Sequence, residues 1–518
     1  MSEPAPAATG QLTVRGAVVL GIGAMVGAGI VVLALSARGR SRCVDRLRAR
    51  AEHEHVVRVL DADYLVVGAG AAGMAFTDAL IDHADDVSVV VVDRRHGAGG
   101  HWLDAYPFVR LHQASAFYGV ASTRLGDGRL QQDGPEAGLH ERATAPEITA
   151  YYARVLQERM LRPGRVSFFP GCDYVGDGRF VSRVSGERFE VRARRPVVDA
   201  RYLAPRIPAD TPPPFEVADG ARVIAVNDLV RLEDAPSQYV IVGSGKTATD
   251  ACIWLLGNGV DPGALCWVRP RDPWMLNRAV VQPDPAVFIG MAADVVGAAA
   301  AASSADDLFL RLEDAGVMLR IDRSVTPTMA KTPTLARWEL DRLRTIEHVV
   351  RLGHVRSAEP TRLVLDEGEV ATAKDAVVVH CAASGLRYPP LVPIWGPDSI
   401  TLQPIRTGFP CFGAALAGYV EATVDGADEK NRLCPPSPYS DTPTDWARMQ
   451  VLGGRAAVSF ASHPGIKAWA DGVPLNPART PPDLAGSAEL AAALTRFRAD
   501  VGPGMARMAE LAGLPAAG

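Results

Sequence analysis

The clearest pattern in the chain is a short run of apolar residues followed at once by closely spaced glycines and a helical segment. It occurs twice, first after Tyr64–Val67 and again after Tyr239–Val242. Each run is four residues long and carries no charge, which is typical of a parallel strand buried on both faces. The sequence therefore predicts an α/β fold with two parallel-sheet units.

The first unit has the features of a dinucleotide site. Gly68, Gly70 and Gly73 follow the apolar run, and a second apolar run, residues 87–92, ends at Asp93. Glycines at this spacing permit a tight turn and a close approach of the backbone to a pyrophosphate, and the acid can accept hydrogen bonds from a ribose. A glycine-rich turn in some other α/β domain is the alternative.

The second unit repeats the turn with Gly243, Gly245 and Ala248, and Lys246 lies within it. Gly245, Lys246 and the threonine after them suggest an ATP-binding phosphate loop. That loop needs a second glycine five positions before Gly245, and Val240 occupies this position. We therefore predict a second dinucleotide site. Lys246 is expected either near a cofactor phosphate or in solvent.

The two units differ at the end of their second strand. Arg269, with Arg271 close behind, occupies the place that Asp93 has in the first unit. An acid repels a 2′-phosphate and an arginine attracts it. We predict that the first unit binds FAD and the second binds NADPH, with NADH as the alternative.

The composition of the chain argues against several other classes of protein. The formal charge of −5 is unlike that of nucleic-acid-binding proteins, which present basic faces. The seven cysteines are scattered without the close pairs of zinc or dithiol sites. We expect no metal site and no disulfide chemistry, and the cysteine pattern suits a reducing compartment.

The amino-terminal region contains a segment that could anchor the protein. Residues 16–37 are 22 residues without a charge, long enough for one transmembrane helix of about 33 Å. Arginines cluster after it, which predicts a cytoplasmic protein attached to the inner face of the membrane. Residues 20–35 also resemble the first membrane helix of amino-acid permeases. A buried glycine-rich segment or a signal peptide are the alternatives.

From residue 63 to about 449 the chain resembles flavin-containing monooxygenases and related two-dinucleotide FAD oxidoreductases. The group has a Gly-Gly-x-Trp segment after the acid of its first unit, matched here by Gly99, Gly100 and Trp102. The resemblance implies that these residues pass close to FAD. It also implies that His112 and Gln113 line the flavin pocket as candidate catalytic residues, although a structural role for His112 is the alternative.

The order of the motifs predicts one domain inserted within another. We expect a disordered segment at residues 1–15, a basic linker at 38–62, and an FAD-binding domain formed by 63–235 and 372–484. An NAD(P)H-binding domain at 236–371 would interrupt it. Residues 376–390 resemble the strand that returns to the FAD domain in this group. Residues 485–518 are rich in alanine, which predicts a helical tail, and they contain no catalytic or binding motif.

The paired cofactors predict an FAD-dependent oxidoreductase reduced by NADPH, resembling a monooxygenase that uses molecular oxygen and a small organic substrate. The Phe-x-Gly-x-x-x-His motif of class B monooxygenases is missing, and residues 383–385 replace the group's Ala-Thr-Gly. A reductase or dehydrogenase without oxygen insertion, and a flavin-binding accessory protein without turnover, therefore remain alternatives. The sequence identifies neither the substrate nor the oligomeric state.

Overall fold

The computed structural model describes residues 57–383, 385, 387–480 and 486–515. Residues 59–518 form one compact unit, to which the description below applies. The expected disordered start, the expected transmembrane helix at 16–37 and residues 38–56 of the basic linker lie outside the described residues. Among the helices that are described, none is long and apolar enough to cross a membrane.

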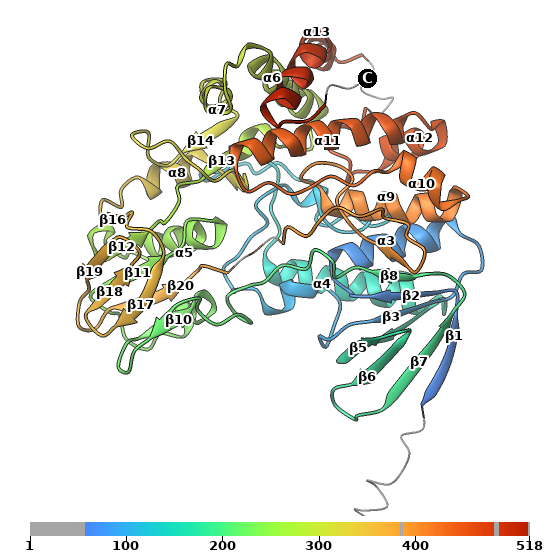
Figure 1. The fold of residues 1–518 in the computed structure, drawn as a ribbon, viewed down its shortest axis with the longest axis horizontal. Helices are drawn as coiled ribbons and strands as arrows, with labels where there is room; N and C mark the ends of the chain where they lie inside the picture. Colours follow the sequence, from blue (N-terminus) through green and yellow to red (C-terminus); the bar gives the residue numbers. More distant parts are fainter. Residues whose placement is uncertain (1–56, 384, 386, 481–485, 516–518) are drawn as a thin grey trace, which may run out of the picture. The chain divides into compact units, whose positions relative to one another are not determined.

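The first parallel sheet has the strand order β21-β8-β2-β3-β4, and Figure 1 labels its strands β8, β2 and β3. Its strands are β2 (Tyr64–Val67), β3 (Val89–Val92), β4 (Val166–Phe169), β8 (Val197–Asp199) and β21 (Ser399–Thr401). Because β21 comes about two hundred residues after β8, this domain is discontinuous, as expected.

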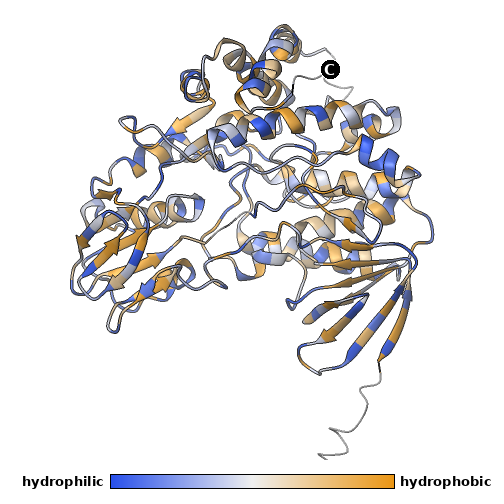
Figure 2. Ribbon diagram, viewed as in Figure 1, coloured by the Kyte–Doolittle hydropathy of each residue, from blue (hydrophilic) through white to orange (hydrophobic). Residues whose placement is uncertain are grey.

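The first sheet is covered on both faces, which explains why β2 and β3 are uniformly apolar (Figure 2). Helix α3 (Ala71–His83) packs against α9 (Pro410–Thr423) so closely that a Cβ on Gly418 would lie 2.3 Å from the Phe76 carbonyl oxygen. The other face packs on an antiparallel sheet. That sheet contains β1 (Arg58–Ala62), β7 (Arg188–Ala193), β6 (Arg179–Ser182) and β5 (Cys172–Gly176).

The second parallel sheet has the order β10-β20-β11-β12-β16. Its strands are β10 (Val223–Ala225), β11 (Tyr239–Val242), β12 (Leu265–Val268), β16 (Val349–Val350) and β20 (Val377–His380). Helix α5 (Lys246–Gly257) follows β11. A small sheet of β9 (Glu216–Val217), β17 (Val355–Glu359), β18 (Arg362–Leu365) and β19 (Gly368–Ala371) shares a core with it.

Strand β20 corrects one expectation. Residues 376–390 were expected to return to the FAD domain, but β20 pairs in parallel with β11 of the second sheet. The return strand of the first sheet is β21 instead. The NAD(P)H-binding domain was expected at residues 236–371. The second sheet extends beyond both limits, because β10 precedes residue 236 and β20 follows residue 371. The expected fold class, two Rossmann-like units with the second inserted in the first, is confirmed.

A helical layer completes the unit (Figure 1). Helix α13 (Ala488–Leu511) lies against α6 (Pro285–Ala301), where a Cβ on Gly504 would meet the Val296 carbonyl oxygen at 2.3 Å. They share a core with α7 (Ala305–Asp314), α11 (Pro443–Ala461) and the sheet of β13 (Trp274–Asn277), β14 (Met318–Arg320) and β15 (Thr334–Leu335). The other helices are α4 (Ala145–Val155), α8 (Arg337–Leu343), α10 (Ala427–Leu433) and α12 (Pro464–Gly472).

Candidate active site

The first glycine turn joins β2 to α3 with the geometry that its spacing predicts. Gly68 has a φ of +111°, which an L side chain rarely adopts. A Cβ on Gly73 would lie 1.8 Å from the Gly68 carbonyl oxygen, so the helix can begin this close to the strand only with glycine there. Asp93, at the end of β3, accepts hydrogen bonds from the amides of Ala69 at 2.6 Å and Arg95 at 2.7 Å. Asp93, which was predicted to bind a ribose, therefore also holds the first glycine turn in place.

The Gly99-Gly100 segment lies against this turn. Both residues have left-handed backbones, with φ of +125° and +59°. The Gly99 amide donates to the Ala69 carbonyl at 2.8 Å, and a Cβ on Gly100 would come within 2.9 Å of the Gly70 Cα atom. The buried Trp102 donates its indole N–H to the Tyr118 hydroxyl at 2.6 Å. The structure thus brings the motif of the resemblance next to the first glycine turn.

The second glycine turn opens into a large cavity. Gly243 has a φ of +128°, whereas Gly245 has an ordinary extended backbone with no atom within 4 Å of an added Cβ. Gly243, Gly245 and Lys246 line a cavity of about 1550 Å³, while Ala248 is fully buried beneath the turn. The open space beside Gly245 is where a pyrophosphate would contact the start of α5.

The two predicted phosphate-binding arginines have different surroundings. Arg269 is 2% exposed; its guanidinium stacks on the Trp267 ring at 4.7 Å and pairs with Asp272 at 3.2 Å. Arg271 lines the cavity, and it pairs with Asp441 at 2.8 Å. Arg271 is therefore the member of the pair that can reach a cofactor in the cavity, and Arg269 supports β12 from within the core.

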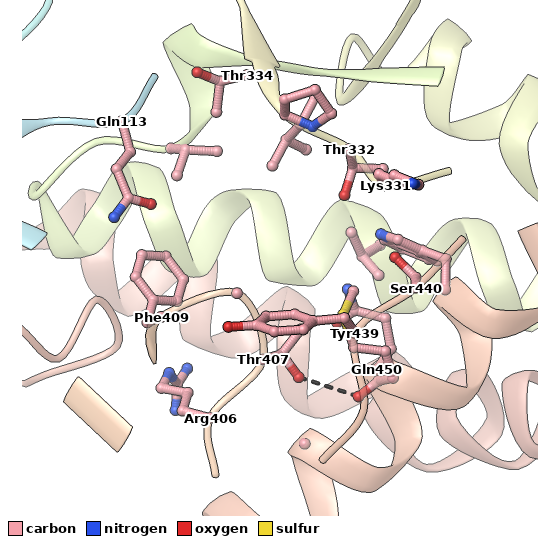
Figure 3. A pocket seen from close by; sticks show the side chains of 18 of the residues that line it. Gln113, Lys331, Thr332, Thr334, Arg406, Thr407, Phe409, Tyr439, Ser440 and Gln450 are labelled. Carbon is pink, nitrogen blue, oxygen red and sulfur yellow. Dashed lines mark hydrogen bonds between the residues drawn. The ribbon is translucent and has the colours of Figure 1, made fainter. Parts of the chain in front are cut away.

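His112 and Gln113, from the first unit, line the same cavity as the second glycine turn, and Figure 3 shows the Gln113 side chain at the cavity wall. The Thr334 amide donates to His112 Nδ1 over 3.5 Å, which leaves the ring proton on Nε2. Burial, with the nearby charges of Lys246 and Arg278, lowers the pKa of His112 to about 3. His112 is thus a neutral imidazole near pH 7 and can donate one hydrogen bond to a bound group without carrying charge.

A buried ion-pair network fixes the His112 loop. Arg278, whose side chain is 1% exposed, pairs with Glu136 and with Glu339, the latter at 2.7 Å, and donates to the His112 carbonyl at 3.2 Å. Arg142 pairs with Glu136 at 2.6 Å. Burial alone would raise the pKa of Glu136, but Arg142 and Arg278 together lower it to about 2. The network joins the first unit to the β15–α8 segment and so holds His112 at the cavity wall.

Lys246 is engaged in a second connection between the units. It pairs with Asp250 one turn along α5, and Asp250 accepts a hydrogen bond from the Tyr106 hydroxyl at 2.8 Å. Tyr106 follows the Gly99–Trp102 segment of the first unit. Lys246 therefore lies at the cavity with its charge balanced, as a cation next to the second glycine turn.

The sequence did not indicate several residues that line the cavity. Arg406, Phe409 and Tyr439 form one part of its wall (Figure 3), and α13, expected to carry no chemistry, contributes side chains such as Phe497 and Met505. These residues come from segments far apart in the chain and belong to no motif. The one available signal is the apolar face of the alanine-rich helices, which predicts packing but not a cavity.

Three helix N-termini are suited to receive negative groups. Helices α3, α5 and α9 have neither a side-chain cap nor an acid in the first turn. Every other α-helix in the described part of the chain has one or the other. Since free amides and the helix dipole favour anions, the glycine turns before α3 and α5 fit the phosphates of two dinucleotides.

Comparison with known proteins agrees with this architecture. A family model described as an NAD(P)-binding Rossmann-like domain matches residues 66–116, which contain the first glycine turn, Asp93 and the Gly99–Trp102 segment. This part of the chain therefore has a Rossmann-like fold.

Closer relatives occur in mycobacteria. "Uncharacterized protein Rv2000" of Mycobacterium tuberculosis and "Uncharacterized protein Mb2023" of Mycobacterium bovis are each 43% identical over 423 residues, which cover 81% of this chain and 78% of theirs. The chain belongs to the same protein family as these mycobacterial proteins.

The solved structures that the chain matches include monooxygenases. An open crystal structure of cyclohexanone monooxygenase has a TM-score of 0.46 at 16% identity, covering 78% of this chain and 98% of that one. A flavin-containing monooxygenase from Stenotrophomonas maltophilia has a TM-score of 0.38 at 16% identity, covering 70% and 97%.

Proposed function

We propose that the protein is an FAD-dependent oxidoreductase reduced by NADPH, acting in the manner of a flavin monooxygenase on a small organic substrate. One observation carries the proposal: the second glycine turn, at Gly243 and Gly245, opens into the same cavity as His112 and Gln113 of the first unit. A nicotinamide bound to one unit and a flavin bound to the other would meet in that cavity.

The first unit is assigned to FAD. Its glycine turn, the uncapped α3 and the Gly99–Gly100 segment would hold the dinucleotide, and each oxygen of the Asp93 carboxylate retains a lone pair for a ribose. When bound, FAD supplies a ring that accepts hydride and passes electrons onward. The chain's own residues hold that ring and shape its surroundings.

The second unit is assigned to NADPH. Gly245 leaves room for the pyrophosphate, and Lys246 and Arg271, each paired with an aspartate, are basic side chains on the same cavity wall that could donate to its phosphates. Neutral His112 and the Gln113 amide are the groups that would donate hydrogen bonds toward the flavin ring and orient it against the nicotinamide. The largely apolar walls would exclude water from the reacting centre.

Reduction without oxygen insertion is the second candidate, because the histidine motif of class B monooxygenases is missing. Anaerobic mixing of the FAD-loaded protein with NADPH, followed by admission of oxygen, distinguishes the two. A transient absorbing species after oxygen, distinct from oxidised and reduced flavin, supports oxygenation. Direct return to the oxidised spectrum supports a reductase, and no bleaching by NADPH would leave only a flavin-binding accessory protein.

A further inference from the structure

The cavity contains a polar corner formed by Arg406, Phe409 and Tyr439, here called the Arg406 corner (Figure 3). Arg406 Nε is buried without a hydrogen-bond partner, and no carboxylate of the described residues pairs with the guanidinium. The Tyr439 hydroxyl, directed to the side of the cavity where Arg406 lies, likewise has no hydrogen bond to a described residue. The corner therefore presents donors that the folded chain does not use.

Arg406 differs in this from the other cations that line the cavity. Lys246 pairs with Asp250, and Arg271 and Lys331 both pair with Asp441. Arg455 donates to the Pro515 carbonyl at 2.8 Å. Arg406 as a whole is only partly buried, but its Nε atom is enclosed by the protein. A charge held in such surroundings without a partner is costly, so its presence at a cavity wall is best explained by a ligand that neutralises it.

The walls beyond the corner are predominantly apolar. Helices α6, α11 and α13 contribute Met291, Val295, Trp446, Met449, Phe497 and Met505. Such a surface favours a hydrocarbon group over a polar one. The cavity therefore combines one unbalanced positive charge with a large, mainly apolar space.

We propose that the substrate is a lipophilic carboxylate, bound with its carboxylate at Arg406 and Tyr439 and its apolar part between α6, α11 and α13. The planar guanidinium matches a carboxylate in a two-point contact, and the uncapped N-terminus of α9 next to Phe409 adds positive potential. A single charge suits a monoanion better than a doubly charged phosphate. The inference rests on the proposed function, since it names the substrate class of that site.

The test uses the full-length protein and two ligands with the same alkyl chain, decanoate and decanol, titrated by calorimetry. Unmodified protein should bind decanoate about 10- to 100-fold more tightly than decanol, the range expected for hydrogen bonds to a charged group. Arg406→Met should remove this preference, because it keeps the side chain's length and removes its charge. Arg406→Lys should retain part of it, and Tyr439→Phe should reduce it.

Arg455→Met is the matched control, since Arg455 lines the same cavity with its guanidinium already engaged, and it should leave the preference intact. Equal affinity for both ligands in the unmodified protein, or an undiminished preference in Arg406→Met, would overturn the inference. So would an Arg406→Met protein whose flavin spectrum changes while its decanoate preference does not, because the guanidinium would then face the cofactor. Failure to bind FAD would instead overturn the proposed function, whatever the ligand preference.

Discussion

At Gly245 the chain has open space beside the backbone, and this makes one residue a clean test of the NADPH site. Gly245→Val should raise the KM for NADPH by about tenfold or more, because the added side chain occupies the space where a pyrophosphate would contact the α5 amides. Stability should change little, since the backbone is extended and no protein atom lies within 4 Å of the new Cβ.

Steady-state kinetics and thermal unfolding of the same sample separate the two effects. Gly472→Val is the control, because Gly472 is also free of neighbours within 4 Å and lies outside the cavity lining. If Gly245→Val bound NADPH normally, the second glycine turn would not be the NADPH site.

The lowered pKa of His112 predicts how the stability of the protein depends on pH. The pKa is about 3 in the folded protein against an ordinary value of 6.5, so between these values the unfolded chain binds a proton that the folded chain does not. Stability should therefore fall as pH falls below about 6.5, by at most about 1.4 kcal/mol per pH unit for this one group. His112→Gln should flatten that dependence in urea unfolding measured from pH 7 to 5. An unchanged slope would mean that His112 titrates normally.

Residue-scale prediction from sequence succeeded where a local pattern imposes the geometry. The conformation at Gly68 and the close contact at Gly73 follow from the spacing of the first turn. Sequence-based prediction was less informative for Arg269, because a position just after a strand does not determine which way its side chain faces. Arg269 lies on the same face as Trp267 and stacks on the Trp267 ring. Arg406 belongs to no motif, and its partnerless state exists only in the folded chain.

At the scale of elements, the Arg278 network connects the His112 loop to β15 and α8. Arg278→Met should lower the free energy of unfolding by about 3–5 kcal/mol, because it leaves the buried carboxylates of Glu136 and Glu339 without their shared cation. Combining it with Glu339→Gln should restore part of the loss. Denaturant unfolding measures both, and strictly additive losses in the double variant would contradict this coupling.

The contact between α13 and α6 gives a second element-scale prediction. Gly504→Ala places a Cβ 2.3 Å from the Val296 carbonyl oxygen, so the helices must move apart, at a cost of about 1–3 kcal/mol. Gly502→Ala, two residues earlier in the same helix, meets no atom within 4 Å and should be neutral or stabilising by up to about 1 kcal/mol. Thermal unfolding should rank the variants in this order; equal melting temperatures would show that the helices do not pack so closely.

Element assignment from sequence was accurate for the glycine-turned units and inaccurate for β20. An uninterrupted apolar run indicates a buried strand but not which sheet it joins, and Val377–His380 pairs with β11 rather than with the first sheet. The alanine-rich tail contains helix α13. Its part in the cavity was missed because alanine and methionine faces look the same whether they pack on a core or border an empty space.

At the scale of the whole molecule, the account depends on two nucleotide sites that share one cavity. The sequence predicted two sites from two local patterns, and the structure adds that residues of both units line the same space. That arrangement could not be predicted from local spacing, because it depends on the packing of segments from residue 112 to residue 509. The protein family does not supply the activity, since the mycobacterial relatives are described only as uncharacterized.

The most direct test of the central claim is the visible absorbance of the purified full-length protein, after incubation with FAD and then with NADPH without oxygen. The account predicts a bound-flavin spectrum that survives removal of free FAD and bleaches on addition of NADPH. A folded protein that remains colourless after FAD incubation, or whose bound flavin NADPH does not bleach, would contradict it.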